Sequence, residues 1–217
     1  FFCMKIKFKR YWRKTSLKQK EAGNFFLRHI SQKKPKNFLE VGIFHGVAAR
    51  NVCELLKSIH GNDFKFTGID LFSIEQASES EIIPQNSFSN PLKTLYYKYI
   101  SRFDPYSLES VLRFLKKFEK NINIIQGNSN KILKEIRLDK VDYVFLDGGH
   151  KYETVKTDLR LLTKVVNNNG TILCDDYNLT YAPGVKQAID EYVAAEKFNL
   201  EILYSRFAEI TKNTRQN

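Results

Sequence analysis

The stretch NFLEVGIFHG, residues 37–46, carries the strongest signal for the fold of this chain. Its first five residues, Asn37–Val41, form a short apolar run that predicts a buried strand. Gly42 and Gly46 follow, and glycine lets the backbone turn tightly and approach a ligand closely. Apolar residues then recur at helical spacing over 47–59. A dinucleotide fingerprint would need a glycine where Phe44 stands, and no Lys-Ser/Thr follows the turn, which excludes a P-loop.

The alternation of strands and helices continues on both sides of this stretch. Further strands are predicted at 64–69, 122–125, 141–146 and 171–174, and helices at 92–103, 107–118, 131–136, 152–166 and 185–197. Two final runs, 200–204 and 208–211, predict a terminal antiparallel hairpin. Such alternation is typical of an α/β protein, in which a mostly parallel sheet carries helices on both faces.

Positive charge is concentrated at the start of the chain. The whole chain has 35 Lys/Arg and 24 Asp/Glu, a formal net charge of +11. Residues 1–36 hold 12 of the basic residues and one acid, so residues 37–217 are neutral overall. We therefore predict a basic helical leader at 1–36 and one domain at 37–217, with a lid insertion at about 71–107. The leader is expected to be a solvated amphipathic helix; an arm that touches nucleic acid or a membrane surface is the alternative.

Composition limits the class of protein further. Hydrophobic residues make up 42% and charged residues 27%, which is ordinary for a globular protein and excludes a disordered chain, a collagen and a coiled coil. The three cysteines, in no metal or disulfide pattern, favour a reducing compartment, so we expect a cytoplasmic protein. No apolar run is long enough to span a membrane, and no signal peptide is evident. The chain starts at Phe1, so it is either a fragment or has its true start at Met4. The sequence leaves the oligomeric state open, a homodimer included.

Polar residues stand where the first three predicted strands end. Ligands of parallel α/β sheets bind beyond the carboxyl ends of the strands. Asp70 closes the second strand, where a carboxylate can accept hydrogen bonds from both hydroxyls of a ribose. A helix cap is the commoner role of such an aspartate. Asn128 and Ser129 follow the third strand; a contact of Asn128 with a base edge is one expectation, and a cap of the next helix by Ser129 is the alternative. His45 lies inside the glycine turn and is expected to line a cofactor pocket.

Three carboxylates follow the fourth and fifth strands, from Asp147, Asp175 and Asp176. Neighbouring parallel strands would bring them to one edge, where crowding raises the pKa of each carboxyl group. Mg²⁺ relieves such repulsion and prefers oxygen ligands, whereas helix capping is the alternative. His150 is a candidate general base because its unperturbed pKa is about 6.5; a bond to its own loop is the alternative. No Cys/His cluster has zinc spacing and no Gly-x-Ser-x-Gly elbow occurs.

As a set, these segments resemble class I S-adenosylmethionine-dependent methyltransferases. LEVGIFHG, at 39–46, resembles the cofactor loop of that family, and FTGIDLF, at 66–72, resembles its ribose-binding strand end. FLDGGHKYETVKTDL and NGTILCDDY, at 145–159 and 169–177, resemble the methyltransferase-24 type, which is related to macrolide-sugar and catechol-like O-methyltransferases. The resemblance covers about 37–197 and implies a Rossmann-like, seven-stranded, mostly parallel sheet with the hairpin at its end.

The resemblance also implies roles for individual residues. The implied contacts to S-adenosylmethionine come from Glu40, Gly42, Phe44, His45, Gly46, Asp70, Leu71, Asn128, Ser129 and Asp147. The implied Mg²⁺ ligands are Asp147, Asp175 and Asp176, with Asp147 and His150 as catalytic residues. Asn128 departs from the Asp that the family often has. Some sugar-modifying relatives carry an acidic general base at the position of Gly149. This chain lacks that base, so His150 is the candidate general base.

The implied activity is Mg²⁺-assisted transfer of a methyl group to a hydroxyl of a small molecule, sugar-like or polyol-like. The hydroxyl would bind near the metal, lose its proton to His150 and attack the sulfonium methyl in line. A methyltransferase acting on nitrogen or nucleic acid through the basic leader is one alternative, although a nucleic-acid partner is not favoured. A nucleotide-binding α/β module without methyl transfer, such as an NAD-dependent enzyme, is another.

Overall fold

A computed structural model of the chain describes residues 13–18, 20–72, 90–101, 104–136, 138 and 140–213. The start of the predicted leader, at 1–12, and part of the predicted lid, at 73–89, therefore lie outside the described residues.

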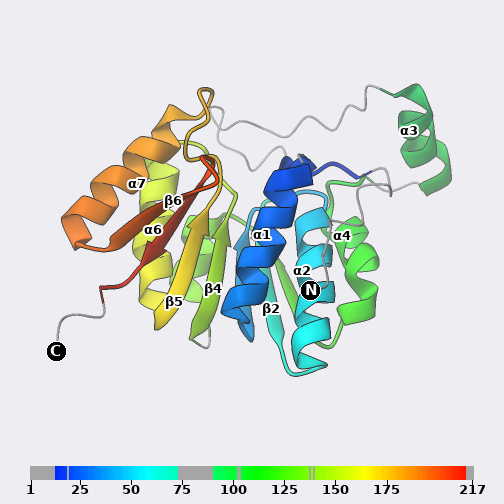
Figure 1. Ribbon diagram of the computed structural model, residues 1–217. Coiled ribbons are helices and arrows are strands. Elements are labelled where there is room, and N and C mark those ends of the chain that lie inside the picture. Colours follow the sequence, from blue (N-terminus) through cyan, green and yellow to red (C-terminus); the bar gives the residue numbers. More distant parts are fainter. Residues whose placement is uncertain are drawn as a thin grey trace.

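The sheet has seven strands in the order β3-β2-β1-β4-β5-β7-β6 (Figure 1). The strands are β1 Asn37–Val41, β2 Lys65–Asp70, β3 Ile122–Gln126, β4 Val141–Leu146, β5 Val166–Cys174, β6 Asn199–Leu203 and β7 Phe207–Thr211. The first five strands pair in parallel, and β7 pairs antiparallel with both β5 and β6. This confirms the predicted fold class. The chain reverses its direction of travel across the sheet between β1 and β4, which makes the carboxyl ends of these two strands the expected binding crevice.

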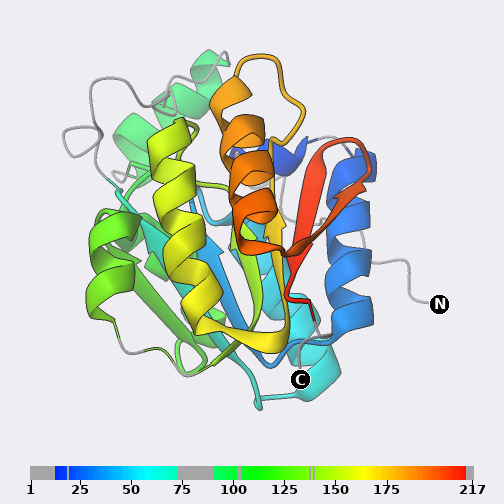
Figure 2. The same cartoon turned by 90° about the vertical axis from the view of Figure 1, so that its left-hand side faces the viewer.

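Helices cover both faces of the sheet (Figures 1 and 2). The α-helices are α1 Lys20–Lys33, α2 Val47–His60, α3 Pro91–Leu95, α4 Leu108–Leu115, α5 Ser129–Glu135, α6 Tyr152–Val165 and α7 Pro183–Glu196. Shorter helical turns are η2 Ser16–Lys18, η3 Tyr96–Ser101 and η4 Lys116–Phe118. One apolar core lies between the sheet and α1, α2 and α4, and a second lies between the sheet and α5, α6 and α7. Among the described residues, no helix is long and apolar enough to cross a membrane.

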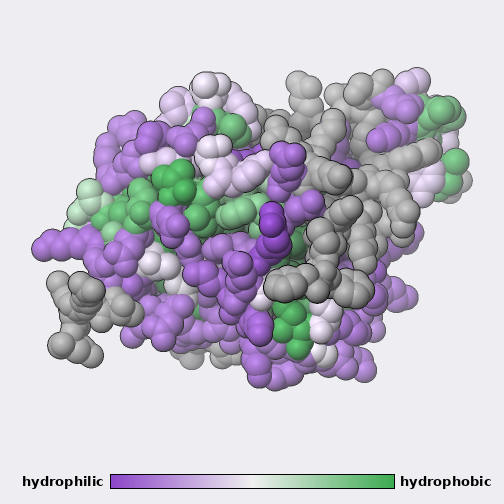
Figure 3. Space-filling view, viewed as in Figure 1, coloured by the Kyte–Doolittle hydropathy of each residue, from purple (hydrophilic) through white to green (hydrophobic). Residues whose placement is uncertain are grey.

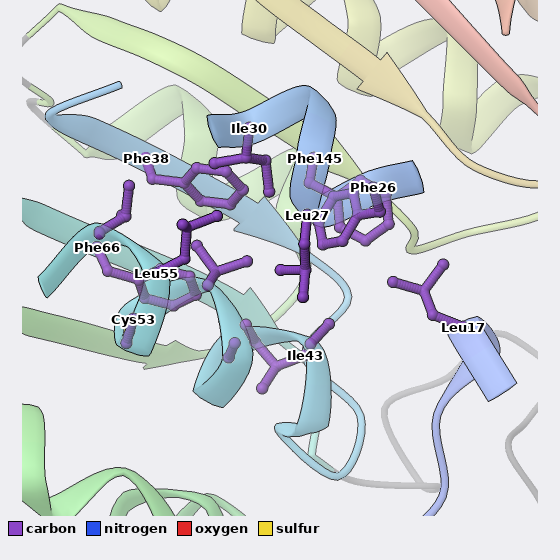
Figure 4. Close-up of a cluster of buried hydrophobic side chains, with 14 of the residues drawn as sticks. Leu17, Phe26, Leu27, Ile30, Phe38, Ile43, Cys53, Leu55, Phe66 and Phe145 are labelled. Atoms are coloured by element: carbon purple, nitrogen blue, oxygen red, sulfur yellow. The ribbon is translucent and has the colours of Figure 1, made fainter. Parts of the chain in front are cut away.

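The first core includes a helix from the segment predicted as a basic leader. Phe26, Leu27 and Ile30 of α1 are at most 1% exposed, and the ring of Phe26 lies 4.4 Å from that of Phe145 on β4 (Figure 4). Burying an aromatic or aliphatic side chain of this size contributes about 1.5–3 kcal/mol. The apolar face of α1 is therefore packed against the domain that follows it.

Two predicted elements differ from the structure. The predicted helix at 92–103 begins as α3, capped by the Asn90 side chain, and continues from Tyr96 as the π-helical turn η3. Neither α3 nor η3 has a buried residue, and hydrophobic side chains show on the surface at α3 (Figure 3). β5 begins at Val166, five positions before the prediction, because its backbone pairs with Val141 despite the polar run between Val166 and Thr171.

Candidate active site

The glycine turn, residues 42–46, connects β1 to α2 and passes close to the end of β4. Gly42 has φ of 96°, and a Cβ atom there would lie 2.0 Å from the carbonyl oxygen of Asp147. Gly46 has φ of 72° and stands directly before α2. The N–H of Asp147 donates to the carbonyl of Val41 at 2.8 Å, which joins the two strand ends. Only glycine fits at position 42, because a side chain there would both collide with backbone and adopt a strained φ.

The carboxylate of Asp70 faces this turn. Its Oδ2 accepts the backbone N–H of Phe44 at 2.7 Å. Its Oδ1 accepts the N–H of Phe72 at 3.1 Å and the hydroxyl of Tyr106 at 2.9 Å. The predicted ribose-binding acid and the predicted cofactor turn are thus brought together. Leu71, which follows Asp70, is half-buried.

Tyr106 is a partner of Asp70 that the sequence did not indicate. The residue is 7% exposed, and burial, together with the Asp70 carboxylate, raises the pKa of its hydroxyl. Thirty-six positions separate it from Asp70, and no motif surrounds it. Its hydroxyl and the N–H of Phe44 in the glycine turn both donate to the Asp70 carboxylate.

Glu40 is a buried acid beneath the turn. The residue is 1% exposed, and neither carboxylate oxygen has a hydrogen-bond partner among the described residues. Burial, with the nearby Asp70 charge, raises the pKa of Glu40 well above its ordinary value. A buried polar group without a partner is costly, so this carboxyl group is suited to a ligand that brings a polar or cationic group.

The segment before α1 crosses from the glycine turn to the end of β4. The Arg13 guanidinium donates to the carbonyl of His45 at 2.8 Å and to the carbonyl of Ser110 at 2.9 Å. The N–H of Lys14 donates to Nδ1 of His45 at 2.9 Å. Ser16 then donates its hydroxyl to Oδ2 of Asp147 at 2.6 Å. His45 is fully buried, with its ring stacked on Phe44 at 4.0 Å. Residues 13–16 therefore connect the glycine turn, through His45, to Asp147 at the end of β4.

The carboxylate cluster, Asp147, Asp175 and Asp176, forms at the ends of β4 and β5 as predicted. The cluster contains a cation that the sequence did not indicate, the guanidinium of Arg206. Arg206 donates to both oxygens of Asp175, from Nε to Oδ1 and from Nη2 to Oδ2, the latter at 2.7 Å. Nη2 also donates to Oδ1 of Asp176 at 3.1 Å. His150 lies on the other side of Asp176, with Nε2 at 2.9 Å from Oδ2.

Burial and mutual repulsion dominate the electrostatics of the cluster. Burial first, and then the charges of Asp175 and Asp176, raise the pKa of Asp147 well above its ordinary value. Burial raises the pKa of Asp175 to about 6, although Arg206 opposes the rise. Asp175 and Asp176 are 3% and 4% exposed, so both depend on internal partners for their charge.

The predicted magnesium site does not fit this arrangement. Each carboxylate of the cluster already accepts a hydrogen bond from a side chain: Ser16 on Asp147, and Arg206 on Asp175 and Asp176. In the part of the chain that the structure describes, no group of three or more His, Cys, Asp or Glu side chains is arranged to hold a metal ion. The hydrogen bonds of this cluster therefore do not support a catalytic step through a metal there.

The residues after β3 have structural partners. Asn128 caps α5, because its side-chain oxygen accepts the N–H of Asn130 at 3.0 Å. Ser129 donates its hydroxyl to Asp158, a fully buried acid of α6, at 3.0 Å. The cap of α5 is thus Asn128 and not Ser129 as predicted, because the Ser129 hydroxyl is bound to Asp158; contact of either residue with an adenine base stays a prediction.

Comparison with known proteins places these motifs in one family. Residues 39–177 match the family model Methyltransf_24, described as a methyltransferase domain. The uncharacterized protein R132 of Acanthamoeba polyphaga mimivirus is 40% identical over 55 residues, a stretch that spans 25% of each chain. The solved structure of the O-methyltransferase NovP has a TM-score of 0.66 at 21% identity and covers 88% of this chain and 81% of its own. CalS11, a TDP-rhamnose 3'-O-methyltransferase of calicheamicin biosynthesis, has a TM-score of 0.56 at 13% identity, with 86% and 77% covered. Both structures share the fold described above.

Proposed function

Because this chain belongs to the Methyltransf_24 family and is a class I S-adenosylmethionine-dependent methyltransferase, we propose that it methylates a hydroxyl oxygen of a small molecule. The observation that carries this proposal is the 2.7 Å contact between Asp70 and the glycine turn, beside the strand end that bears His150. This arrangement supports a cofactor site at Asp70 and the glycine turn, and an acceptor site at His150, on the two sides of the β1–β4 junction.

The cofactor side consists of the glycine turn, Asp70 and Glu40. Because Gly42 has no side chain, the glycine turn lies directly against the backbone of Asp147 at the end of β4. In the proposal, Asp70 accepts hydrogen bonds from the ribose hydroxyls, and the unpartnered carboxyl group of Glu40 lies near cationic or polar groups of the cofactor. Phe44, His45, Gly46, Leu71, Asn128, Ser129 and Asp147 are proposed to complete the cofactor pocket. When bound, S-adenosylmethionine supplies the electrophilic methyl group, whose bond to sulfur breaks as the acceptor oxygen takes it.

The acceptor side consists of His150 and the carboxylate cluster. His150 is half-buried, and its bond to Asp176 orients the imidazole. We propose that His150 takes the proton of the acceptor hydroxyl as the new carbon–oxygen bond forms. Asp147 is the other catalytic candidate, since its backbone lies where β4 meets the glycine turn and its carboxylate accepts the hydroxyl of Ser16. Because Arg206 and Ser16 bind the carboxylates, the magnesium assistance predicted from sequence is not part of the mechanism.

A sugar-like or polyol-like acceptor is proposed for its chemistry. The side chains around His150 are acids, a guanidinium and the exposed Tyr181, whose ring lies 6.2 Å from the imidazole. Acids and guanidinium groups suit a ligand with several hydroxyls, and an aromatic ring suits the apolar face of a sugar. CalS11, which shares the fold, acts on TDP-rhamnose.

Calorimetry and product analysis test the proposal. The purified protein is titrated with S-adenosylmethionine, S-adenosylhomocysteine and NAD, and Asp70→Ala serves as the binding-deficient variant. We expect micromolar binding of the first two ligands, none of NAD, and binding of S-adenosylmethionine weakened by about 10- to 100-fold in the variant. The protein is then incubated with the methyl donor and a panel of sugar nucleotides, polyols and catechols, and products are located by mass and NMR.

Methylation of an oxygen, lost in His150→Ala, supports the proposal. Binding of NAD without the methyl donor overturns it, as does methyl transfer confined to amines or to RNA.

A further inference from the structure

A tight hairpin turn places Arg206 at the carboxylate cluster. Tyr204 and Ser205 both adopt positive φ, 52° and 50°, as the two central residues of the turn between β6 and β7. The N–H of Arg206 donates to the carbonyl of Leu203 at 3.3 Å and closes this turn, so Arg206 is the last of three residues between the paired Leu203 and Phe207. The carbonyl of Arg206 accepts the N–H of Tyr177, so the residue is also fixed at the end of β5. Its position is therefore set by backbone geometry on two sides.

The guanidinium is nearly enclosed and uses several of its donors. The Arg206 side chain is 13% exposed, and the Asp175 side chain that it grips at both oxygens is fully buried. It also contacts Asp176 at 3.1 Å and donates to the carbonyl of Ser16 at 3.3 Å. A planar guanidinium suits this bidentate recognition of a carboxylate better than an ammonium group does.

We propose that Arg206 is the resident cation of this site and takes the place of a divalent metal, so that the enzyme transfers methyl groups without one. This inference rests on the proposed function. Arg206 acts as a positioning residue: it neutralises Asp175 and holds Asp176, and Asp176 in turn holds His150 at 2.9 Å. Its contact with Ser16 extends the same arrangement to the segment that crosses the site.

The opposite possibility is that a metal displaces the guanidinium. Displacement would break both bonds to Asp175 and leave a largely buried cation to find other partners, which is unfavourable in a desolvated site. The two cases differ in a property that does not require turnover, namely the affinity of the cluster for a divalent ion.

Mn²⁺ is the probe, because the electron paramagnetic resonance signal of the free ion falls when it is bound. The wild-type protein, Arg206→Met and Arg206→Lys are titrated, with Arg160→Met, an exposed arginine of α6, as the matched control. We expect the wild type, Arg206→Lys and the control to leave the signal unchanged. Arg206→Met should gain one site for Mn²⁺, and the double variant with Asp175→Asn should lose it.

Turnover is measured on the same samples with EDTA and with added Mg²⁺. We expect the wild type to be unaffected by EDTA, Arg206→Met to lose at least tenfold in kcat, and Arg206→Lys to recover part of that loss. Binding of Mn²⁺ at a single site in the wild type, or loss of its turnover in EDTA, overturns the inference even if Arg206→Met fails to fold. Full activity of Arg206→Met in EDTA overturns it as well. Calorimetry with S-adenosylmethionine separates these outcomes from failure of the proposed function, which would abolish cofactor binding in the wild type.

Discussion

Replacing Gly42 with alanine tests whether the close approach of β1 and β4 builds the cofactor side of the site. The new methyl group would lie 2.0 Å from the carbonyl oxygen and 2.5 Å from the carbonyl carbon of Asp147. Both are backbone atoms, so no side-chain rotation relieves the collision. The two strand ends must separate, and the bonds from Gly42 to Ile69 and from Asp147 to Val41 are lost or weakened.

The expected cost follows from these contacts. A residue with a Cβ atom at such a positive φ costs about 1–3 kcal/mol in strain. Two weakened backbone hydrogen bonds add about 1–3 kcal/mol. Gly61 supplies the matched control, because its φ is also positive, 64°, whereas a Cβ there would meet nothing within 4 Å. Gly61→Ala should therefore show the strain alone.

Urea unfolding and calorimetry are the assays. We expect Gly42→Ala to be less stable than Gly61→Ala by about 1–3 kcal/mol, the hydrogen-bond contribution. Cofactor affinity should fall in Gly42→Ala at a temperature where the variant is folded, and should stay at the wild-type value in Gly61→Ala. Equal stability of the two variants, together with wild-type cofactor affinity of Gly42→Ala, would refute the reasoning.

Three further predictions concern cofactor affinity and stability. Asp70→Ala should weaken S-adenosylmethionine binding by about 10- to 100-fold, as charge-assisted hydrogen bonds of about 1.5–3 kcal/mol are lost; calorimetry that finds wild-type affinity contradicts the ribose role. Phe26→Ala should lower the free energy of unfolding by about 3–5 kcal/mol, because the ring is fully buried against Phe145; a loss below 1 kcal/mol in urea would show that α1 is not part of the core. Burial opposes ionisation of Glu209, but His29 and Lys33 outweigh it and lower its pKa from 4.5 to about 2. Its contribution to stability is thus present above pH 4.5 and lost as the pH falls towards 2, a slope that urea titrations should find flattened in Glu209→Gln.

The sheet could be predicted where apolar runs end abruptly in glycine or aspartate. β1 and β4 have the predicted bounds, since Gly42 and Asp147 follow strongly apolar strands. The start of β5 was missed because Asn167–Gly170 resembles a loop, although Val166 before it pairs with Val141 of β4. The sequence pattern of a segment reflects its own side chains, whereas its pairing as a strand also depends on the neighbouring strand.

The site was predictable in part for a similar reason. Asp70 and the three clustered aspartates follow strands, so the parallel sheet fixes where they meet. Arg206 and Tyr106 act on those aspartates from distant turns, and no spacing in the sequence connects them. The sequence showed the carboxylates that suggested a metal, but not the guanidinium of Arg206 that binds two of them.

The strand order divides the molecule along the junction of β1 and β4. The glycine turn and Asp70 come from the first half of the chain, and His150 and Arg206 from the second. Under the proposed function, changes in the second half would alter the acceptor that is bound, while the first half would keep the same cofactor. One narrow constraint between the halves lies at Gly42, where a single added methyl group would collide with the backbone of Asp147.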